Sequence, residues 1–142
     1  MLRQDDFVCS MLLQASYRWT NQKINGDDAY GGYIPCLMVA GTILNRTRCG
    51  WGSILEVISR IPKFAAEDEP PVIYPSIWEP SFIRLLHELP SQQDGSGIDY
   101  SKGALYFCDS RRITKDWFRT NILEQKDIHP CVANMNTLML FK

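Results

Sequence analysis

The chain has 142 residues, of which 45% are hydrophobic and 22% are charged. This length suits one ordinary domain, and this composition is globular, so disordered and fibrous classes are excluded. The 15 basic and 16 acidic residues leave a formal net charge of −1, which argues against nucleic-acid binding. We therefore expect a single domain over residues 1–142.

The cysteines and the start of the chain bear on the cellular context. Five cysteines are scattered without a CxxC pair or a histidine at zinc-ligand spacing (Cys9, Cys36, Cys49, Cys108 and Cys131). We interpret them as reduced thiols, which favours synthesis in a reducing cytosol, and we expect no metal site and no cofactor. Residues 1–6 carry two acids where a signal peptide needs positive charge, and no stretch approaches the roughly 20 apolar residues of a membrane span. The sequence therefore predicts neither a signal peptide nor membrane insertion.

The first half of the chain is expected to be helical. Apolar residues recur at helical spacing over residues 7–17, which predicts a first helix with one buried stripe. Residues 21–32 contain Asn-Gly and Gly-Gly pairs and are expected to form a loop or a small hairpin. Pro35 suits the first position of a second, largely buried helix, because the N–H group at that position has no intrahelical acceptor. Gly50 can terminate this helix.

Two further helices are expected before residue 90. Ser53 and Glu56 match a capping box that opens a short third helix, which Pro62 must stop. Residues 67–75, with three prolines and three acids, predict a surface loop. Pro80 is placed to begin a fourth helix that ends at the next proline.

The last third of the chain is expected to hold the β structure. Residues 91–101 are polar and contain glycine, which predicts a loop. Residues 104–107 predict a short aromatic strand, and residues 117–118 and 138–141 predict further short strands or packing segments. The sequence thus predicts a mainly helical α+β domain with a small irregular β element.

Several short segments occur in the order and spacing of one known family. They are residues 12–15 (LLQA), 39–46 (VAGTILNR), 54–58 (ILEVI), 63–66 (KFAA) and 103–107 (GALYF), followed by Trp117. Together they resemble the spore-cortex-lytic (SleB-type) cell wall hydrolases over roughly residues 7–141. The resemblance implies a lysozyme-like domain that binds peptidoglycan glycan strands and cleaves their β-1,4 bonds with one essential glutamate.

Gln14 occupies the position of that glutamate. Cleaving a glycosidic bond requires an acid that protonates the leaving oxygen, and an amide has no proton to donate at neutral pH. The resemblance therefore implies a chain that keeps glycan binding and loses about 10²–10⁴-fold in turnover. We expect residue 14 where the first helix ends, facing a groove. We interpret the other acids considered as solvated or capping residues and not as replacements (Asp27, Asp28, Glu56, Glu67 and Asp68).

Five aromatic residues are candidates for contact with the substrate. Tyr17 and Trp19 directly follow the candidate site and are our preferred groove aromatics. The rings of Phe64, Tyr106 and Trp117 can stack on the apolar faces of sugars, but for any one of them core packing is the simpler interpretation.

Polar residues at the end of the second helix are candidates for a supporting role. The resemblance suggests that Asn45 and Arg46 brace the floor of the groove, whereas the helix dipole alone explains the arginine equally well. We interpret His87 and His129 as ordinary polar positions and not as metal ligands or bases.

Three functions remain open on the sequence. The first is a peptidoglycan glycosidase or lytic transglycosylase, encoded by a phage or a bacterium and inactivated by Gln14. The second is a non-catalytic glycan-binding or structural module with an assembly partner in a virion or cell-envelope complex. The third is an unrelated helical interaction domain. In the first two cases, a protein made in the cytoplasm acts at the cell wall after release or lysis.

Overall fold

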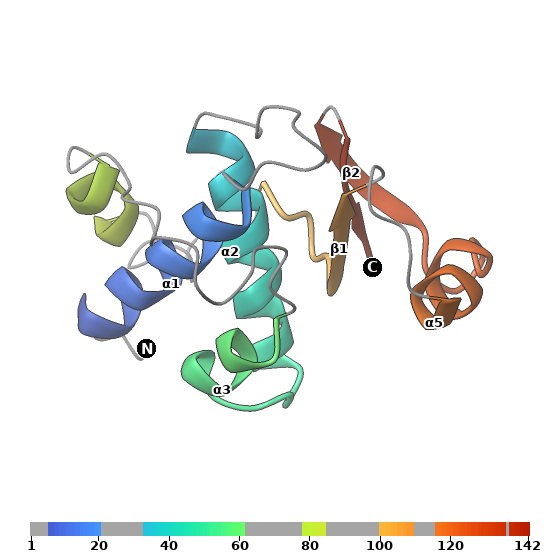
Figure 1. The fold of residues 1–142 in the computed structure, drawn as a ribbon, viewed down its shortest axis with the longest axis horizontal. Helices are drawn as coiled ribbons and strands as arrows, with labels where there is room; N and C mark the ends of the chain where they lie inside the picture. Colours follow the sequence, from blue (N-terminus) through green and yellow to red (C-terminus); the bar gives the residue numbers. More distant parts are fainter. Residues whose placement is uncertain (1–5, 21–32, 62–77, 85–99, 110–115, 136) are drawn as a thin grey trace.

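The computed structural model describes residues 6–20, 33–61, 78–84, 100–109, 116–135 and 137–142. Helices gather on one side of the molecule, a small antiparallel sheet lies on the other, and a short helical segment extends beyond the sheet (Figure 1). The described residues confirm the predicted mainly helical α+β class. The loops predicted at 21–32, 67–75 and 91–99 lie outside the described residues.

The first predicted helix is confirmed as α1, which spans Asp6–Thr20. It buries a stripe at helical spacing (Cys9, Leu12, Leu13, Ser16, Trp19 and Thr20). The helix continues past the predicted end at residue 17 because Trp19 and Thr20 still belong to this buried stripe. The hydroxyl of Thr20 donates to the carbonyl oxygen of Ser16 at 2.9 Å, so the last turn also satisfies its own polar side chain.

The second helix, α2, spans Tyr33–Arg48 and so begins before Pro35 and not at it. Proline is tolerated within the first turn because the N–H groups there have no intrahelical acceptor. At the other end, Gly50 has a φ of +85°. The N–H groups of Gly50 and Trp51 donate to carbonyl oxygens of the last turn at 3.2 and 3.1 Å. These two bonds form a Schellman motif, which confirms Gly50 as the residue that ends the helix.

The third helix, α3, spans Ile54–Ser59. Ser53 is confirmed as its N-cap residue, because the backbone N–H of Glu56 donates to the hydroxyl of Ser53 at 3.2 Å, and the same hydroxyl lies 3.2 Å from the carboxylate of Glu56. The helix ends ahead of Pro62, which lies outside the described residues.

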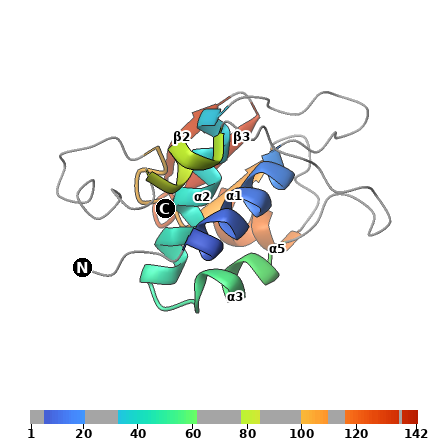
Figure 2. The same ribbon diagram turned by 90° about the vertical axis from the view of Figure 1, so that its left-hand side faces the viewer.

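A further helix covers residues 78–84, which confirms a helix in this region. It begins before Pro80, which therefore stands within its first turn and not at its start. Its Phe82 is fully buried, whereas the predicted end at Pro90 lies outside the described residues. Both views place α1 between this helix and α3 (Figures 1 and 2).

Three strands form one antiparallel sheet in the order β1-β3-β2. They are β1 (Tyr106–Asp109), β2 (Cys131–Met135) and β3 (Leu138–Phe141). The prediction of a strand at 138–141 is confirmed, and β1 begins at Tyr106 and not at Ala104. We did not predict β2, which pairs with β3 through an irregular register between Cys131 and Ala133.

Of the two alternatives for residues 117–118, a strand is wrong and a packing segment is confirmed for Phe118, whose ring meets that of Phe141 edge-on at a centroid distance of 6.1 Å. This segment is the short helix α5 (Asp116–Phe118), which continues into the π-helix η2 (Arg119–Leu123). Aromatic residues favour strands, but this preference depends on a neighbouring strand, and these two residues lie in a helical segment anchored by the buried Ile122. Asn121 adds a hydrogen bond from its side-chain amide to the carbonyl oxygen of Trp117 at 2.9 Å.

Among the described residues, the buried side chains of α1, α2, α3, the helix over 78–84 and the sheet form one hydrophobic cluster. Trp19 joins the two sides of this core, because its ring meets that of Phe107 edge-on at a centroid distance of 4.8 Å. Within the same described ranges, no helix combines the length and the apolar character needed to cross a lipid bilayer.

Candidate functional site

Gln14 lies on the surface of α1, on the side opposite the buried stripe. The prediction that the first helix ends here is wrong, because Gln14 stands about one and a half turns before Thr20. The negative end of the helix dipole therefore does not lie at residue 14. The predicted accessibility of this side chain holds, since it is exposed.

The helix over 78–84 packs beside this face of α1. Ser10 Oγ donates to Glu79 Oε1 at 2.6 Å, and the ring of Tyr17 meets that of Trp78 edge-on at 5.2 Å. Ser10, Gln14 and Tyr17 follow one another on the same side of α1 at spacings of four and three residues. Because Ser10 and Tyr17 are half-buried and Gln14 is exposed, Gln14 stands at the rim of this helix contact.

Sequence reasoning missed Glu79 and Trp78. We placed the start of the fourth helix at Pro80, which left both residues in a preceding loop. A signal was available in the spacing of Trp78 and Phe82, which lie one turn apart when the helix begins earlier. The pairing with Ser10 joins residues 69 positions apart, and no local pattern predicts such a contact.

The role predicted for Trp19 as a groove aromatic is wrong. Its side chain is only 6% exposed and belongs to the hydrophobic cluster. Its ring is packed against Phe107 at an interplanar angle of 90°. A ring so buried has no free face for a sugar. Tyr17, in contrast, is half-buried beside Gln14 and keeps the predicted position.

Asn45 and Arg46 hold the segment that leads into β1. The amide Nδ2 of Asn45 donates to Ser101 Oγ at 3.0 Å and to the carbonyl oxygen of Ala104 at 2.9 Å. The Nε of Arg46 donates to the carbonyl oxygen of Leu105 at 2.6 Å. Two segments singled out in the sequence, at the end of α2 and at 103–107, are therefore bonded to each other.

The guanidinium of Arg46 is enclosed by aromatic rings. Its carbon lies 5.0 Å from the centroid of the Trp51 ring and 5.1 Å from that of Phe107. Burial lowers the pKa of Arg46 to about 10, against an ordinary value of 12.5. The group is still protonated at neutral pH, so it acts there as a fixed cation and hydrogen-bond donor.

Tyr106 belongs to what we call the aromatic row, formed by Trp51, Tyr106 and His129. The Tyr106 ring lies 5.7 Å from that of Trp51 and 5.1 Å from that of His129, both edge-on. The Nδ1 of His129 lies 2.9 Å from the carbonyl oxygen of Lys142, which fixes the imidazole as a polar packing group. Trp51 is 37% exposed, so this row reaches the surface.

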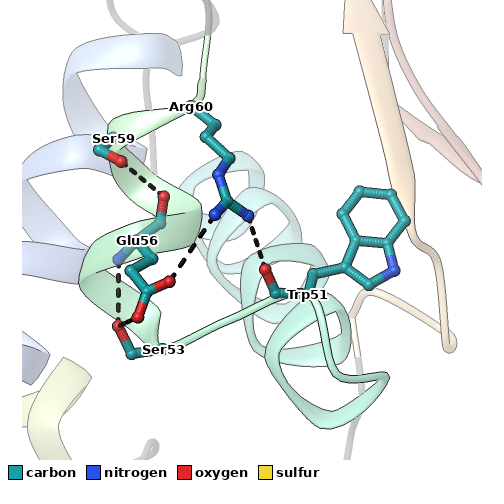
Figure 3. Close-up of polar contacts among 5 residues, drawn as sticks. All are labelled: Trp51, Ser53, Glu56, Ser59 and Arg60. Atoms are coloured by element: carbon teal, nitrogen blue, oxygen red, sulfur yellow. Dashed lines mark hydrogen bonds and ion pairs between the residues drawn. The ribbon is translucent and has the colours of Figure 1, made fainter.

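Both backbone polar groups of Trp51, its N–H and its carbonyl oxygen, are hydrogen-bonded. The Nη1 of Arg60 donates to the carbonyl oxygen of Trp51 at 2.6 Å, and the same guanidinium lies 3.7 Å from the carboxylate of Glu56. Figure 3 shows the indole ring pointing away from these polar contacts toward the sheet. The ring thus stands at the surface on a residue whose carbonyl group is hydrogen-bonded.

The remaining predicted site residues are not brought to Gln14. Trp117 is 62% exposed on α5, at the opposite end of the molecule from α1 (Figure 1). Figure 1 also shows α2 between α1 and β1, the strand that begins at Tyr106. Phe64 lies outside the described residues.

The described residues contain no group of three or more histidine, cysteine or acidic side chains that can hold a metal ion. The five cysteines are free thiols, of which Cys9 and Cys36 are buried and Cys49 and Cys131 are exposed. Comparisons of the chain with family models, with curated proteins and with solved structures find no match.

Proposed function

We propose that the chain is a lysozyme-like domain of the SleB type that binds peptidoglycan glycan strands. The observation that supports this most is the bonding of Asn45 and Arg46 to Ser101, Ala104 and Leu105. The resemblance assigns a bracing role to the first two residues and a strand to the last segment. Three hydrogen bonds between segments far apart in sequence are what such a role requires.

Two surface features suit a polysaccharide ligand. The aromatic row offers an exposed indole on a fixed backbone, and the faces of sugar rings present apolar C–H groups to such rings. Gln14 is exposed, so an extended polymer can reach its amide, which both donates and accepts hydrogen bonds. Because this amide cannot act as an acid, we expect binding with little turnover.

Retention on insoluble peptidoglycan and clearing of purified sacculi test this function. We expect the chain to be retained without clearing, and the Gln14→Glu variant to be retained and to clear. The matched control is Gln125→Glu, which makes the same chemical change at an exposed position that follows η2. It should be retained and should not clear.

A non-catalytic glycan-binding module is the second candidate, and the exposed amide at residue 14 favours it. It predicts that the chain and its Gln14→Glu variant are both retained and both inert toward sacculi. Absence of retention for either protein would exclude both candidates and leave a helical interaction domain.

A further inference from the structure

Arg46 is a half-buried cation that forms no ion pair with any acid among the described residues. Within that part of the chain, its Nε donates to the carbonyl oxygen of Leu105, and its guanidinium lies over the rings of Trp51 and Phe107. A charge removed from water is destabilising unless an opposite charge or enough hydrogen-bond acceptors compensate for it. One carbonyl oxygen and two rings compensate for this guanidinium only in part.

The neighbouring Arg60 is better compensated than Arg46. Its guanidinium lies 3.7 Å from the carboxylate of Glu56 and donates to the carbonyl oxygen of Trp51 at 2.6 Å (Figure 3). The side chain of Arg60 is also 62% exposed, so water hydrates its charge. In contrast, burial lowers the pKa of Arg46 to about 10, and the neighbour that opposes this lowering is Tyr106 and not a carboxylate. The less hydrated of the two cations is thus the one without an anion.

The contacts of Arg46 leave its two Nη groups for a ligand. Its Nε is bonded to Leu105, and rings lie over its guanidinium carbon at 5.0 and 5.1 Å. The Nη groups bond to no described residue, and they are not sealed from solvent. Two such N–H donors in one plane match the two oxygens of a carboxylate. The indole of Trp51 is 37% exposed beside them, so a ligand here meets a cation and an apolar ring together.

We propose that Arg46 and Trp51 form a binding site for a carboxylate of peptidoglycan. The inference rests on the proposed function, which supplies the polymer, because peptidoglycan bears carboxylates on the lactyl groups of its glycan and on its stem peptides. The carboxylate accepts hydrogen bonds from both Nη groups, and the part of the polymer that carries it packs on the indole. Arg46 lies in the last turn of α2, whereas Gln14 lies on α1. The site therefore selects the polymer and takes no part in bond cleavage.

Equilibrium binding of three soluble tetrasaccharides to the unchanged chain tests this site. The first is a chitin fragment without carboxylates, the second a peptide-free glycan fragment with lactyl carboxylates, and the third the same glycan fragment with its stem peptides attached. We expect at least one carboxylate-bearing fragment to bind about tenfold more tightly than the chitin fragment, as for a hydrogen bond to a charged group. The fragment that gains affinity identifies the source of the carboxylate. Equal binding of all three would overturn the inference and leave glycan binding intact.

Substitution of Arg46 tests whether this residue causes the preference. Arg46→Gln replaces the guanidinium with an uncharged amide, so the preference for the carboxylate-bearing fragment should be lost. The matched control is Arg48→Gln, which removes the same charge at an exposed position on the same helix and should keep the preference. An equal loss in both variants would indicate general attraction by positive charge and would overturn the inference.

A measurement on the unchanged chain keeps the test independent of whether the Arg46 variant folds. The NMR resonances of the side-chain Nε–H groups of Arg46 and Arg48 are followed while sodium acetate replaces sodium chloride at constant ionic strength. The Arg46 resonance should shift and reach saturation, and the Arg48 resonance should not. If acetate shifts Arg46 and no tetrasaccharide binds, the proposed function falls and a carboxylate site stands. A response of Arg46 no larger than that of Arg48 would overturn the site itself.

Discussion

The Nε of Arg46 donates to the carbonyl oxygen of Leu105 at 2.6 Å and so fastens the end of α2 to the segment that leads into β1. Its guanidinium also lies over the rings of Trp51 and Phe107. A planar guanidinium can bond sideways through Nε while its face stacks on aromatic rings, and a lysine ammonium cannot do both.

We therefore expect Arg46→Lys to lower the free energy of unfolding by about 1.5–3 kcal/mol, the value of a hydrogen bond from a charged group. Urea denaturation measures this loss. Arg48→Lys is the control, because Arg48 is exposed on the same helix, and we expect it to change stability by at most about 0.5 kcal/mol. Equal losses in the two variants would show that the Leu105 contact does not fasten the sheet.

Trp19 and Trp117, which we selected for sugar contact, differ in burial. We therefore expect a large loss of stability when one is removed and a small loss when the other is removed. Trp19→Ala should lower the free energy of unfolding by about 3–5 kcal/mol, because the side chain is 6% exposed and packs in the core. Trp117→Ala should cost about 0.5 kcal/mol or less, because the side chain is 62% exposed. Thermal denaturation of the two variants and of the unchanged chain measures both losses of stability. A large loss for Trp117 would mean that α5 is held by this ring.

The aromatic row makes a prediction about ligand affinity. Trp51→Ala should weaken retention on peptidoglycan about fivefold to tenfold, which corresponds to about 1 kcal/mol for one stacked ring at a surface. Trp117→Ala, which removes an exposed ring that does not belong to the row, should leave retention unchanged. Binding isotherms on sacculi supply both values. A loss of the same size in both variants would indicate unspecific adsorption through exposed rings.

The features that the sequence predicted well are those set by neighbouring residues. A serine three residues before a glutamate defines a capping box within one turn, and Gly50 supplies the positive φ that ends α2. The stripe of α1 is likewise periodic within the helix itself. In these cases the physical cause lies within a few residues of its effect.

The features that the sequence did not predict depend on distant partners. Trp19 follows Gln14 so closely that it looked like part of a site, but contact with Phe107 of β1 decides its burial. The strand β2 shows only a weak alternation of buried and exposed residues, and its pairing with β3 makes it a strand. Glu79 joined the candidate site only because its helix packs on α1. Each outcome is set by tertiary packing, which overrides local preference.

The capping box of α3 offers a local test of stability. Ser53→Ala removes the hydroxyl that accepts from the N–H of Glu56 at 3.2 Å, which leaves that N–H to water (Figure 3). We expect a loss of about 1 kcal/mol in urea denaturation. Ser59→Ala, at the other end of the same helix, removes an exposed hydroxyl that donates to the carbonyl oxygen of Glu56, where water can take its place, and should lower the free energy of unfolding by less than about 0.5 kcal/mol. Equal effects would contradict a capping role.

A buried thiol makes stability depend on pH in the alkaline range. Burial raises the pKa of Cys36 from 9.0 to about 12, and burial, followed by the nearby Cys36, raises that of Tyr33 from 10.0 to about 12. In both groups the folded chain holds its proton at a pH where the unfolded chain has released it. Their stabilising contribution is complete below the unfolded pKa and is lost as the pH rises toward the folded pKa.

For Cys36 this window runs from about pH 9 to about pH 12, and three pKa units set an upper limit of about 4 kcal/mol on the loss. Between about pH 9 and pH 10.5 we expect its share of the unfolding free energy to fall by about 2 kcal/mol. Urea denaturation at several pH values should therefore show that the unfolding free energy falls less steeply with rising pH for Cys36→Ala than for the unchanged chain. Cys49→Ala, at an exposed thiol, is the matched control for the loss of a cysteine side chain. Parallel curves for all three proteins would mean that the Cys36 thiolate is as well solvated in the folded chain as in the unfolded one.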